Sequence, residues 1–469
     1  MFETLLFVTD VRGERGQNWR APITAPGPQG KDMLRSVLLI RRDPLRFLND
    51  VWLRHGDLVQ FPIPRPATYL VTDPQAVRSV LVTNARHHSK QTLQYSNLAL
   101  VTGNGLLTAD DPPWREHRRV IQPAFHHEAL EGMAGQVTSA VEPFIQAWQP
   151  LRGGSLVDID AAMMKLSLHV VASALFGARW HDQSARLTSS TVIALDAVVA
   201  RARNPLAPPV NWPTPGNRRL RRSAADLDKA VETVLSGREK RIAGAATGPD
   251  LVDLLLADSN SDDPHFDRRA IRDELVTFLV AGHETVASAL TWTWFLLASN
   301  PEAATTLRNE LDSVLGGRMP GFADLQSLPW TRAVIDETLR LYPPAWVITR
   351  KSLIDQQLAG IEVRSGSLLI MSPWLVHRHT SAWDDSGEFH PARFLTRTSR
   401  PEPDYFPFGL GPRLCIGRDL ALMECTLILA AIAARFEFSL PAGTDSAALA
   451  SVTLRPAHGL RMLIRGRRR

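Results

Sequence analysis

The chain has 469 residues, of which 44% are hydrophobic and 22% are charged, and its formal net charge is +5. This length and composition are typical of a globular protein with a large buried core, and they exclude a disordered or fibrous chain. The charge excess is too small to indicate nucleic-acid binding, although the basic tail over 465–469 favours an acidic protein partner.

A small β-rich lobe is predicted beside a mostly helical remainder. Apolar residues alternate over 58–61 and 68–71, and strand patterns return at 346–350, 360–363 and 367–371, so the lobe is expected from about 55–75 and 346–371. Near the C-terminus, 436–438 and 452–454 are expected to pair with 460–464. Residues 1–30 are rich in Pro and Gly and are expected to be irregular. Because no linker divides the chain, we expect one domain over 1–469.

Helical periodicity accounts for most of the remaining chain. Residues 87–107 show no clear periodicity and are expected to be irregular, and the five prolines within 205–215 predict an extended segment. The longest pattern, 267–299, would be about 50 Å long. Its middle is apolar on nearly every face and is expected to be buried all round. Helices are expected over 43–55, 74–84, 112–125, 128–148, 157–177, 186–204, about 217–241 and 267–299.

Two cysteines occur in the chain, and Cys415 lies in the Gly/Pro-rich turn Phe408-Gly-Leu-Gly-Pro-Arg-Leu-Cys-Ile-Gly417, directly before an apolar helix pattern. A thiolate there would lie beside backbone N–H groups and a helix N-terminus, which both favour negative charge. The glycines allow the backbone to wrap closely around a flat group, and Phe408 offers an aromatic face. These features predict a haem-iron ligand; the alternative is a structural cysteine in a turn.

The second cysteine, Cys425, follows on the predicted helix and is expected to be a small core residue. A disulfide between the two would consume the proposed ligand, so a reducing compartment fits better. The apolar stretch 2–8 is too short to span a bilayer, so we expect no transmembrane anchor and a cytoplasmic location.

The turn resembles the haem-binding loop of the cytochrome P-450 family, Phe-x-x-Gly-x-Arg-x-Cys-x-Gly, with every fixed position filled. The resemblance implies heme b (iron protoporphyrin IX), with the Cys415 thiolate as axial ligand and Phe408, Arg413 and Gly417 at the cofactor. It also implies the fold of that family: mainly α with a small β-rich lobe, and the haem between a long distal helix and the cysteine loop.

Ala281-Gly-His-Glu-Thr285 interrupts the long apolar helix. An acid and an alcohol are costly to bury without partners. The Thr285 hydroxyl can bond back to the Ala281 carbonyl and bend the helix, and Gly282 would ease local widening. The alternative is a solvated turn with a self-satisfied threonine. The pattern resembles the family's Ala-Gly-x-Glu-Thr signature, which implies that Thr285 donates to iron-bound dioxygen and that Glu284 relays protons.

Glu337 and Arg340 lie at i and i+3, on one face of a predicted helix. Alone, such a pair is usually a weak surface salt bridge. Together with Arg393 it resembles the family's Glu-x-x-Arg network, which implies a structural role in supporting the haem loop. Ala392 departs from relatives that often have Glu there, but the arginine is retained.

Trp114 and Arg118 lie at i and i+4 and can point at one ligand edge. Arginine suits carboxylates because it forms bidentate, charge-assisted hydrogen bonds. The resemblance assigns both residues to the haem propionates, with Arg350 and Arg413 as further partners. The alternative is an ordinary basic amphipathic helix. His117 and His377 are weaker candidates nearby.

These features predict a monooxygenase that inserts one oxygen atom from O2 into an apolar substrate, by hydroxylation or epoxidation of a fatty acid, terpenoid or polyketide-like molecule. No Gly-x-Gly-x-x-Gly unit or flavin domain is recognisable, so the electrons are expected from a ferredoxin or flavodoxin with its reductase. Docking is expected at Arg115, Arg119 and Arg418. The same fold acting as a peroxide-using isomerase or peroxygenase, or as a non-catalytic haem-thiolate binding protein, remains the alternative.

The substrate pocket is expected to be apolar. Trp346 should narrow it, and Arg65 and Tyr69 are candidates to anchor a fatty-acid carboxylate, the alternative being ordinary strand residues. The segment 88–107 is expected to supply the roof, with Leu93, Tyr95 and Leu98. The expected wall consists of Leu279, Val280, Ala281, Val286, Ala345, Trp346, Val347 and Ile348.

Overall fold

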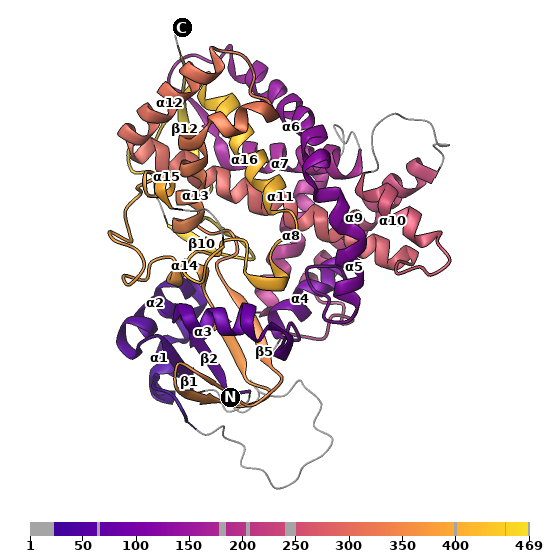
Figure 1. Ribbon diagram of the computed structural model, residues 1–469, viewed down its shortest axis with the longest axis vertical. Coiled ribbons are helices and arrows are strands. Elements are labelled where there is room, and N and C mark those ends of the chain that lie inside the picture. Colours follow the sequence, from indigo (N-terminus) through magenta and orange to yellow (C-terminus); the bar gives the residue numbers. More distant parts are fainter. Residues whose placement is uncertain are drawn as a thin grey trace.

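A computed structural model describes residues 23–62, 66–177, 184–202, 207–239, 250–397, 401–445 and 447–467. Helices dominate it, and a small sheet lobe built largely from N-terminal segments lies at one end (Figure 1). The helices are α1 Gly30–Arg42, α2 Pro44–His55, α3 Pro74–Arg78, α4 Leu93–Thr102, α5 Pro113–Ile121, α6 His127–Trp148, α7 Ile159–Phe176, α8 Ser184–Ala202, α9 Pro215–Glu239, α10 Leu251–Ser259, α11 Arg268–Ser299, α12 Pro301–Leu315, α13 Pro329–Leu341, α14 Pro373–Val376, α15 Arg393–Thr396 and α16 Arg418–Ala433.

The predicted lobe is confirmed as a five-stranded sheet of order β1-β2-β8-β5-β3. Only β2 and β8 pair in parallel, which brings Thr68 opposite Leu368; the other neighbours are antiparallel. The sheet therefore joins segments about 300 residues apart in the sequence. The strands are β1 Leu58–Phe61, β2 Thr68–Val71, β3 His88–Ser89, β4 Ser155–Asp158, β5 Ile348–Ser352, β6 Gln356–Leu358, β7 Ile361–Val363, β8 Leu368–Met371, β9 Phe436–Ser439, β10 Ala448–Ala450, β11 Leu454–Pro456 and β12 Arg461–Gly466.

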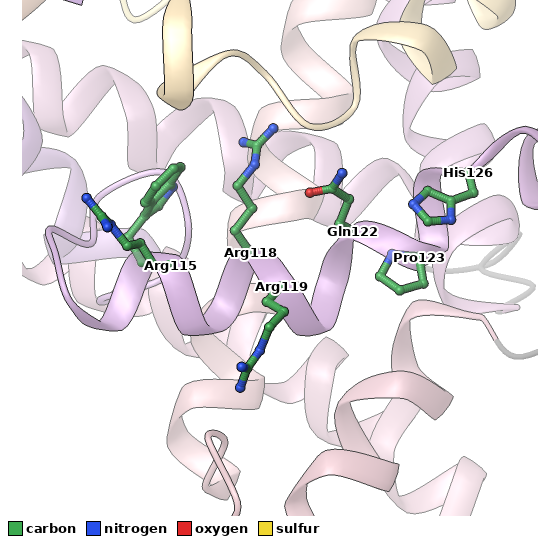
Figure 2. Close-up of a pocket in the computed structure, with 7 residues that line it drawn as sticks. Arg115, Arg118, Arg119, Gln122, Pro123 and His126 are labelled. Atoms are coloured by element: carbon green, nitrogen blue, oxygen red, sulfur yellow. The ribbon is translucent and has the colours of Figure 1, made fainter. Parts of the chain in front are cut away.

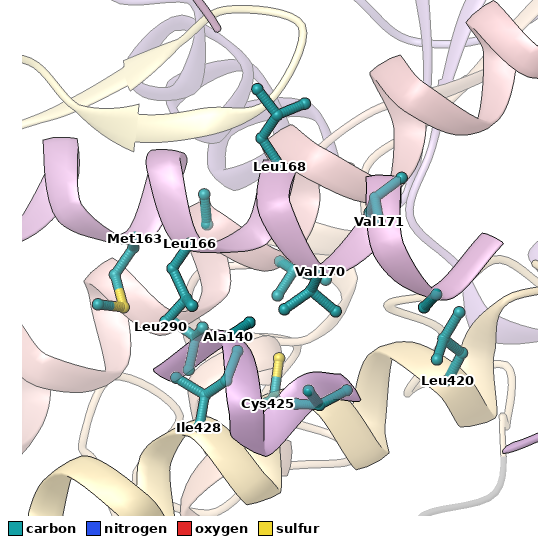
Figure 3. Close-up of a cluster of buried hydrophobic side chains, with 14 of the residues drawn as sticks. Ala140, Met163, Leu166, Leu168, Val170, Val171, Leu290, Leu420, Cys425 and Ile428 are labelled. Atoms are coloured by element: carbon teal, nitrogen blue, oxygen red, sulfur yellow. The ribbon is translucent and has the colours of Figure 1, made fainter. Parts of the chain in front are cut away.

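Helix α11 runs through the middle of the helical part and packs against α7, α13 and α16. Its first turn is capped by the Asp267 carboxylate, which accepts the Ala270 N–H at 2.7 Å, and it ends at Asn300 before a proline. Most of the middle of α11 is buried, as predicted, but Ala281, Gly282 and Thr285 keep partial exposure. Figure 3 shows part of this core, in which Cys425 of α16 lies among apolar side chains of α6 and α7, so its prediction as a core residue is confirmed.

Several elements differ from the sequence-based expectations. Residues 87–107, expected to be irregular, contain α4. This helix has no amphipathic pattern because both polar and apolar residues on it are buried, and it is stabilised by packing against α8 and α11. Strand β11 pairs with β10, not with 460–464, whereas β12 pairs with β9 as expected and also with β4. Helices α1, α10 and α12 and strands β3, β4, β6 and β10 were not predicted.

One of the described helices, α7, is long and apolar enough to cross a membrane. Most of its residues are buried inside the protein, where α7 packs against α11, α6 and α8.

Candidate functional site

The Cys415 loop takes its shape from two glycines and from close packing on a neighbouring turn. Gly409 and Gly411 have φ of 75° and 70°, a region that favours glycine. A Cβ on Gly411 would lie 2.1 Å from the Leu81 carbonyl oxygen, so the loop packs tightly on the π-helical turn Ser79–Thr83. The Cys415 N–H donates to the Phe408 carbonyl at 2.9 Å, and α16 begins three residues later.

Cys415 is accessible at its surface, although protein atoms surround it on most sides. This burial raises the pKa of its thiol, while the Gly417 N–H and the positive charges of Arg118 and Lys90 act in the opposite direction. The nearby positive charges only partly offset the effect of burial on the thiol. A cationic metal centre bound to this accessible sulfur would stabilise the thiolate further. Cys425 differs, because it is buried among apolar groups that raise its pKa well above the usual value.

The middle of α11 provides a second accessible surface. Ala281, Gly282 and Thr285 keep partial exposure, although their neighbours His283 and Glu284 are buried. The Thr285 hydroxyl donates to the Ala281 carbonyl at 2.6 Å, which confirms the predicted back-bond. Gly282 serves close packing and not widening, because a Cβ there would meet Val171 of α7 at 2.9 Å.

Glu284 is 3% exposed, and burial raises its pKa to about 7, although Arg455 acts in the opposite direction. Its Oε1 lies 3.6 Å from Arg455 Nη1, and its Oε2 has no hydrogen-bond partner among the described residues. Arg455 also donates to Asp160 Oδ2 at 2.9 Å. Neither Arg455 nor Asp160 was predicted from the sequence. The one signal for Arg455 was its charge beside the predicted apolar strand 452–454.

A cluster of cations surrounds Trp114. The Arg413 and Arg118 guanidinium carbons lie 3.9 and 5.6 Å from its ring centre. Arg413 donates to the Ala109 carbonyl at 2.7 Å, and burial lowers its pKa to about 10. Arg350 donates to the Tyr95 hydroxyl at 3.2 Å. The structure thus brings together the four residues that the sequence assigned to propionates.

Lys90 is a member of this cluster that sequence reasoning missed. Its Nζ donates to the Leu107 carbonyl at 2.8 Å, and burial, with Arg350 and Arg413, lowers its pKa well below the usual value. Asp110 offsets part of this charge. Crowded, buried cations are unfavourable without anions, so the cluster fits the two propionate carboxylates of a haem.

Arg118 also braces the cysteine loop, since its Nη1 donates to the Leu414 carbonyl at 2.8 Å. Figure 2 shows it pointing from α5 towards that loop, whereas Arg119 points away from it. Arg119 bonds His265 at 3.0 Å, and His117 bonds Glu274 of α11 at 2.7 Å. His117 therefore links α5 to α11.

The buried network predicted around Glu337 is present. Glu337 Oε1 accepts from Arg340 at 2.8 Å and from Arg393 at 3.1 Å, and Oε2 accepts from Arg340 at 2.7 Å. Arg340 is fully buried and donates further to three carbonyls of the segment leading to the cysteine loop. His377 supports the same region, because its Nε2 accepts the Phe406 N–H at 2.9 Å.

The residues predicted to line the substrate pocket fall into two groups, those with contacts elsewhere and those that could still line it. Leu93 is 65% exposed, which does not fit a roof over an apolar pocket, and Tyr95 belongs to the cation cluster. Trp346 packs against α2 and the β10–β11 hairpin and donates to the Ser451 carbonyl at 2.9 Å. Tyr69 is buried, with its hydroxyl 2.8 Å from Thr24, so it is no carboxylate anchor.

Arg65, its suggested companion, lies outside the described residues. The other pocket positions lie on α4, on α11 and in the segment that leads into β5. Leu98, Leu279, Val280, Val286 and Ile348 are buried, and Ala281, Ala345 and Val347 are partly exposed. No group of three or more His, Cys, Asp or Glu side chains that could hold a bare metal ion occurs in the described ranges.

The family model of cytochrome P450 (P-450) matches residues 25–458. The chain belongs to the cytochrome P-450 family. Similar proteins include cyclooctat-9-en-7-ol 5-monooxygenase of Streptomyces melanosporofaciens, 35% identical over 90% of each chain. Pentalenene oxygenase of Streptomyces avermitilis is 32% identical over 95% of this chain and 97% of that protein.

Among solved structures, this P-450 is similar to CYP175A1 of Thermus thermophilus, with a TM-score of 0.75, 32% identity, and coverage of 93% of this chain and 97% of that one. The predicted fold is therefore confirmed. The protein is a cytochrome P-450 monooxygenase, and its cofactor is a haem with a cysteine-ligated iron. The accessible Cys415 sulfur and the cation cluster around Trp114 fit that cofactor.

Proposed function

We propose that this P-450 oxidises an apolar, terpenoid-like molecule at a haem held by Cys415. The observation that carries the assignment is the accessible Cys415 sulfur at depth in the protein, in a loop with Arg118 and Lys90 nearby. The names of two relatives, a cyclooctat-9-en-7-ol monooxygenase and a pentalenene oxygenase, favour a cyclic hydrocarbon skeleton over a fatty acid. The described chain also offers no carboxylate anchor at Tyr69.

The haem supplies oxygen activation when bound, and thiolate ligation favours O–O cleavage. The protein's own residues hold it: Lys90, Arg350 and Arg413 provide charge for the propionates, and Phe408 and Gly417 line the proximal loop. Arg118 fixes the loop through the Leu414 carbonyl.

Thr285 and Glu284 would deliver protons on the α11 side. The Thr285 hydroxyl is a donor that can turn from the Ala281 carbonyl towards a bound ligand, and its partial exposure leaves room for this. Glu284 has a pKa of about 7, near the value that suits a general acid at neutral pH. This pair favours monooxygenation over the peroxide-using alternatives, which need no such delivery.

Electrons would come from a ferredoxin or flavodoxin with its reductase, in the cytoplasm. Arg115 has a 67% exposed side chain and Arg119 is exposed, beside an open depression on α5 (Figure 2). Arg418 is mostly covered and is paired with Asp419 at 2.7 Å. Arg115 and Arg119 are therefore the stronger docking candidates for an acidic partner.

The test is turnover of the purified holoenzyme with a surrogate ferredoxin, its reductase and NADPH, on a panel of cyclic terpenes and matched linear fatty acids. We expect an oxygenated product from at least one cyclic terpene, with 18O from labelled O2. Oxidation of fatty acids alone would refute the substrate class, and product formed with peroxide but not with O2 and electrons would refute the reaction.

A further inference from the structure

Arg455, on β11, lies between the buried carboxylate of Glu284 and the largely covered carboxylate of Asp160, which belong to different helices. It donates to Asp160 of α7 at 2.9 Å and lies 3.6 Å from Glu284 of α11. The first distance is a hydrogen bond and the second is an ion pair without one. Arg455 and Asp160 are themselves largely covered, with side chains 18% and 13% exposed.

The pairing is incomplete on both sides. Glu284 Oε2 and Asp160 Oδ1 are buried, and neither has a hydrogen-bond partner within the described parts of the chain. Buried polar atoms are almost always satisfied, so two orphaned carboxylate oxygens beside one arginine are unusual. One guanidinium therefore serves two acids and holds Glu284 less closely than Asp160.

The groups around Glu284 come from four elements. His283 of α11 is fully buried, and burial lowers its pKa to about 3, so it is neutral. Asp196 of α8 is exposed and, like Asp160, disfavours charge on Glu284, whereas Arg455 favours it. The charge on Glu284 thus depends on one cation, two anions and the neighbouring Thr453 hydroxyl, which favours the charged form.

We propose that Arg455 is a positioning residue for Glu284, and that Asp160 competes for Arg455 and so sets how readily Glu284 takes up a proton. This inference rests on the proposed role of Glu284 in proton delivery. When Arg455 turns to Glu284, the carboxylate stays charged; when Arg455 stays with Asp160, Glu284 binds a proton from solvent at Oε2 and can later release it towards Thr285. Asp196 marks the solvent side of this group.

The decisive experiment measures the protonation of Glu284 directly in the resting holoenzyme. Its carboxylic acid C=O band is isolated by subtracting the infrared spectrum of Glu284→Gln and is followed between pH 5 and 9. Arg455→Gln is expected to raise the midpoint by about one pH unit or more, and Asp160→Asn to lower it by a similar amount. Opposite shifts from two neighbouring substitutions are not expected from a general loosening of the fold.

Two controls accompany these variants. Arg455→Lys keeps the charge and should hold the midpoint within about half a unit. Arg461→Gln removes an arginine of β12 that is 70% exposed, and it should leave the midpoint unchanged. If Arg455→Gln fails to fold, Asp160→Asn and Arg455→Lys still decide the question. Shifts in the same direction, or no shift, would overturn the inference.

A second readout separates this inference from the proposed function. Hydrogen peroxide released per electron is measured against pH, and its midpoint should move with the infrared midpoint in Asp160→Asn. If the infrared midpoint moves and the peroxide yield does not, the relay through Glu284 is wrong but the positioning by Arg455 stands. If the infrared midpoint does not move, the positioning is wrong whatever the peroxide yield.

Discussion

Two buried glutamate–arginine pairs in this protein are built in opposite ways. Glu337 has both oxygens bonded, and all five N–H groups of Arg340 donate to the carboxylate or to carbonyls. Glu284 has one oxygen 3.6 Å from Arg455 and the other without a partner in the described chain. The first pair anchors the segment that precedes the cysteine loop, and the second lies on the α11 surface where chemistry is proposed.

The difference shows that one fold can contain both a buried ion pair that fixes the structure and a buried acid that can exchange a proton. A fully satisfied network fixes its geometry and gains nothing from a change of protonation. An incompletely paired acid, by contrast, has a pKa of about 7 and can exchange a proton at neutral pH. Breaking each pair should therefore have a different consequence.

The largest effect is expected at the satisfied pair. Glu337→Ala leaves the Arg340 charge buried without its partner, so unfolding should become easier by about 3–5 kcal/mol, with loss of haem. Urea denaturation and the haem content of the purified protein measure both. Glu302→Ala, at an exposed position on α12, is the matched control. A cost below about 1 kcal/mol would contradict the structural role.

A smaller, pH-dependent effect is expected at Glu284. Its pKa is raised from 4.5 to about 7, so the folded state holds a proton that the unfolded state releases between those values. Stability from this group is therefore lost as pH rises, and Glu284→Gln should gain up to about 3 kcal/mol relative to wild type between pH 4 and 8. Urea unfolding at both pH values tests this. A pH-independent difference would place the Glu284 pKa near its usual value.

Removing the alcohol should affect coupling more than stability. Thr285→Ala deletes a hydroxyl that, within the described parts of the chain, donates to a carbonyl of its own helix, so the fold should persist. Electrons should then reach peroxide in place of product, lowering product per NADPH by at least about 10-fold. Thr291→Ala, which removes the same kind of back-bond elsewhere on α11, is the control. Unchanged coupling in Thr285→Ala would exclude the threonine from proton delivery.

The smallest effect is expected at the surface. The double variant Arg115→Glu/Arg119→Glu should slow the first electron transfer by about 3- to 10-fold at low salt, with the difference fading at high salt. Stopped-flow reduction under carbon monoxide follows it. Arg41→Glu/Arg42→Glu, exposed on α1, should have no effect. Equal rates at every salt concentration would move the docking site elsewhere.

Sequence patterns were sufficient where the signal is local. The Cys415 turn, the Glu337–Arg340 spacing and the periodicity of α11 each lie within one segment, and the structure brings each together as predicted. Helix α4 was missed because its burial comes from α8 and α11 and not from its own pattern.

Contacts between distant segments could not be predicted where the family resemblance does not mark the residues. Lys90 joins the cation cluster through residues more than 250 positions later, and Arg455 meets Asp160 295 positions earlier. Neither residue type nor spacing marks these partners, since arginine and lysine are common on surfaces. The contacts of Tyr69 and Trp346 could not be predicted for the same reason, because their partners come from other elements.

The most direct test of the account is the optical spectrum of the dithionite-reduced protein under carbon monoxide, recorded for the wild type, Cys415→His and Cys425→Ser. We predict a strongly red-shifted carbonyl band for the wild type and for Cys425→Ser, and its loss in Cys415→His, because Cys415 supplies the thiolate. A wild-type band at the position of histidine-ligated haem, or a red-shifted band that survives in Cys415→His, would contradict the assignment of Cys415 as the iron ligand.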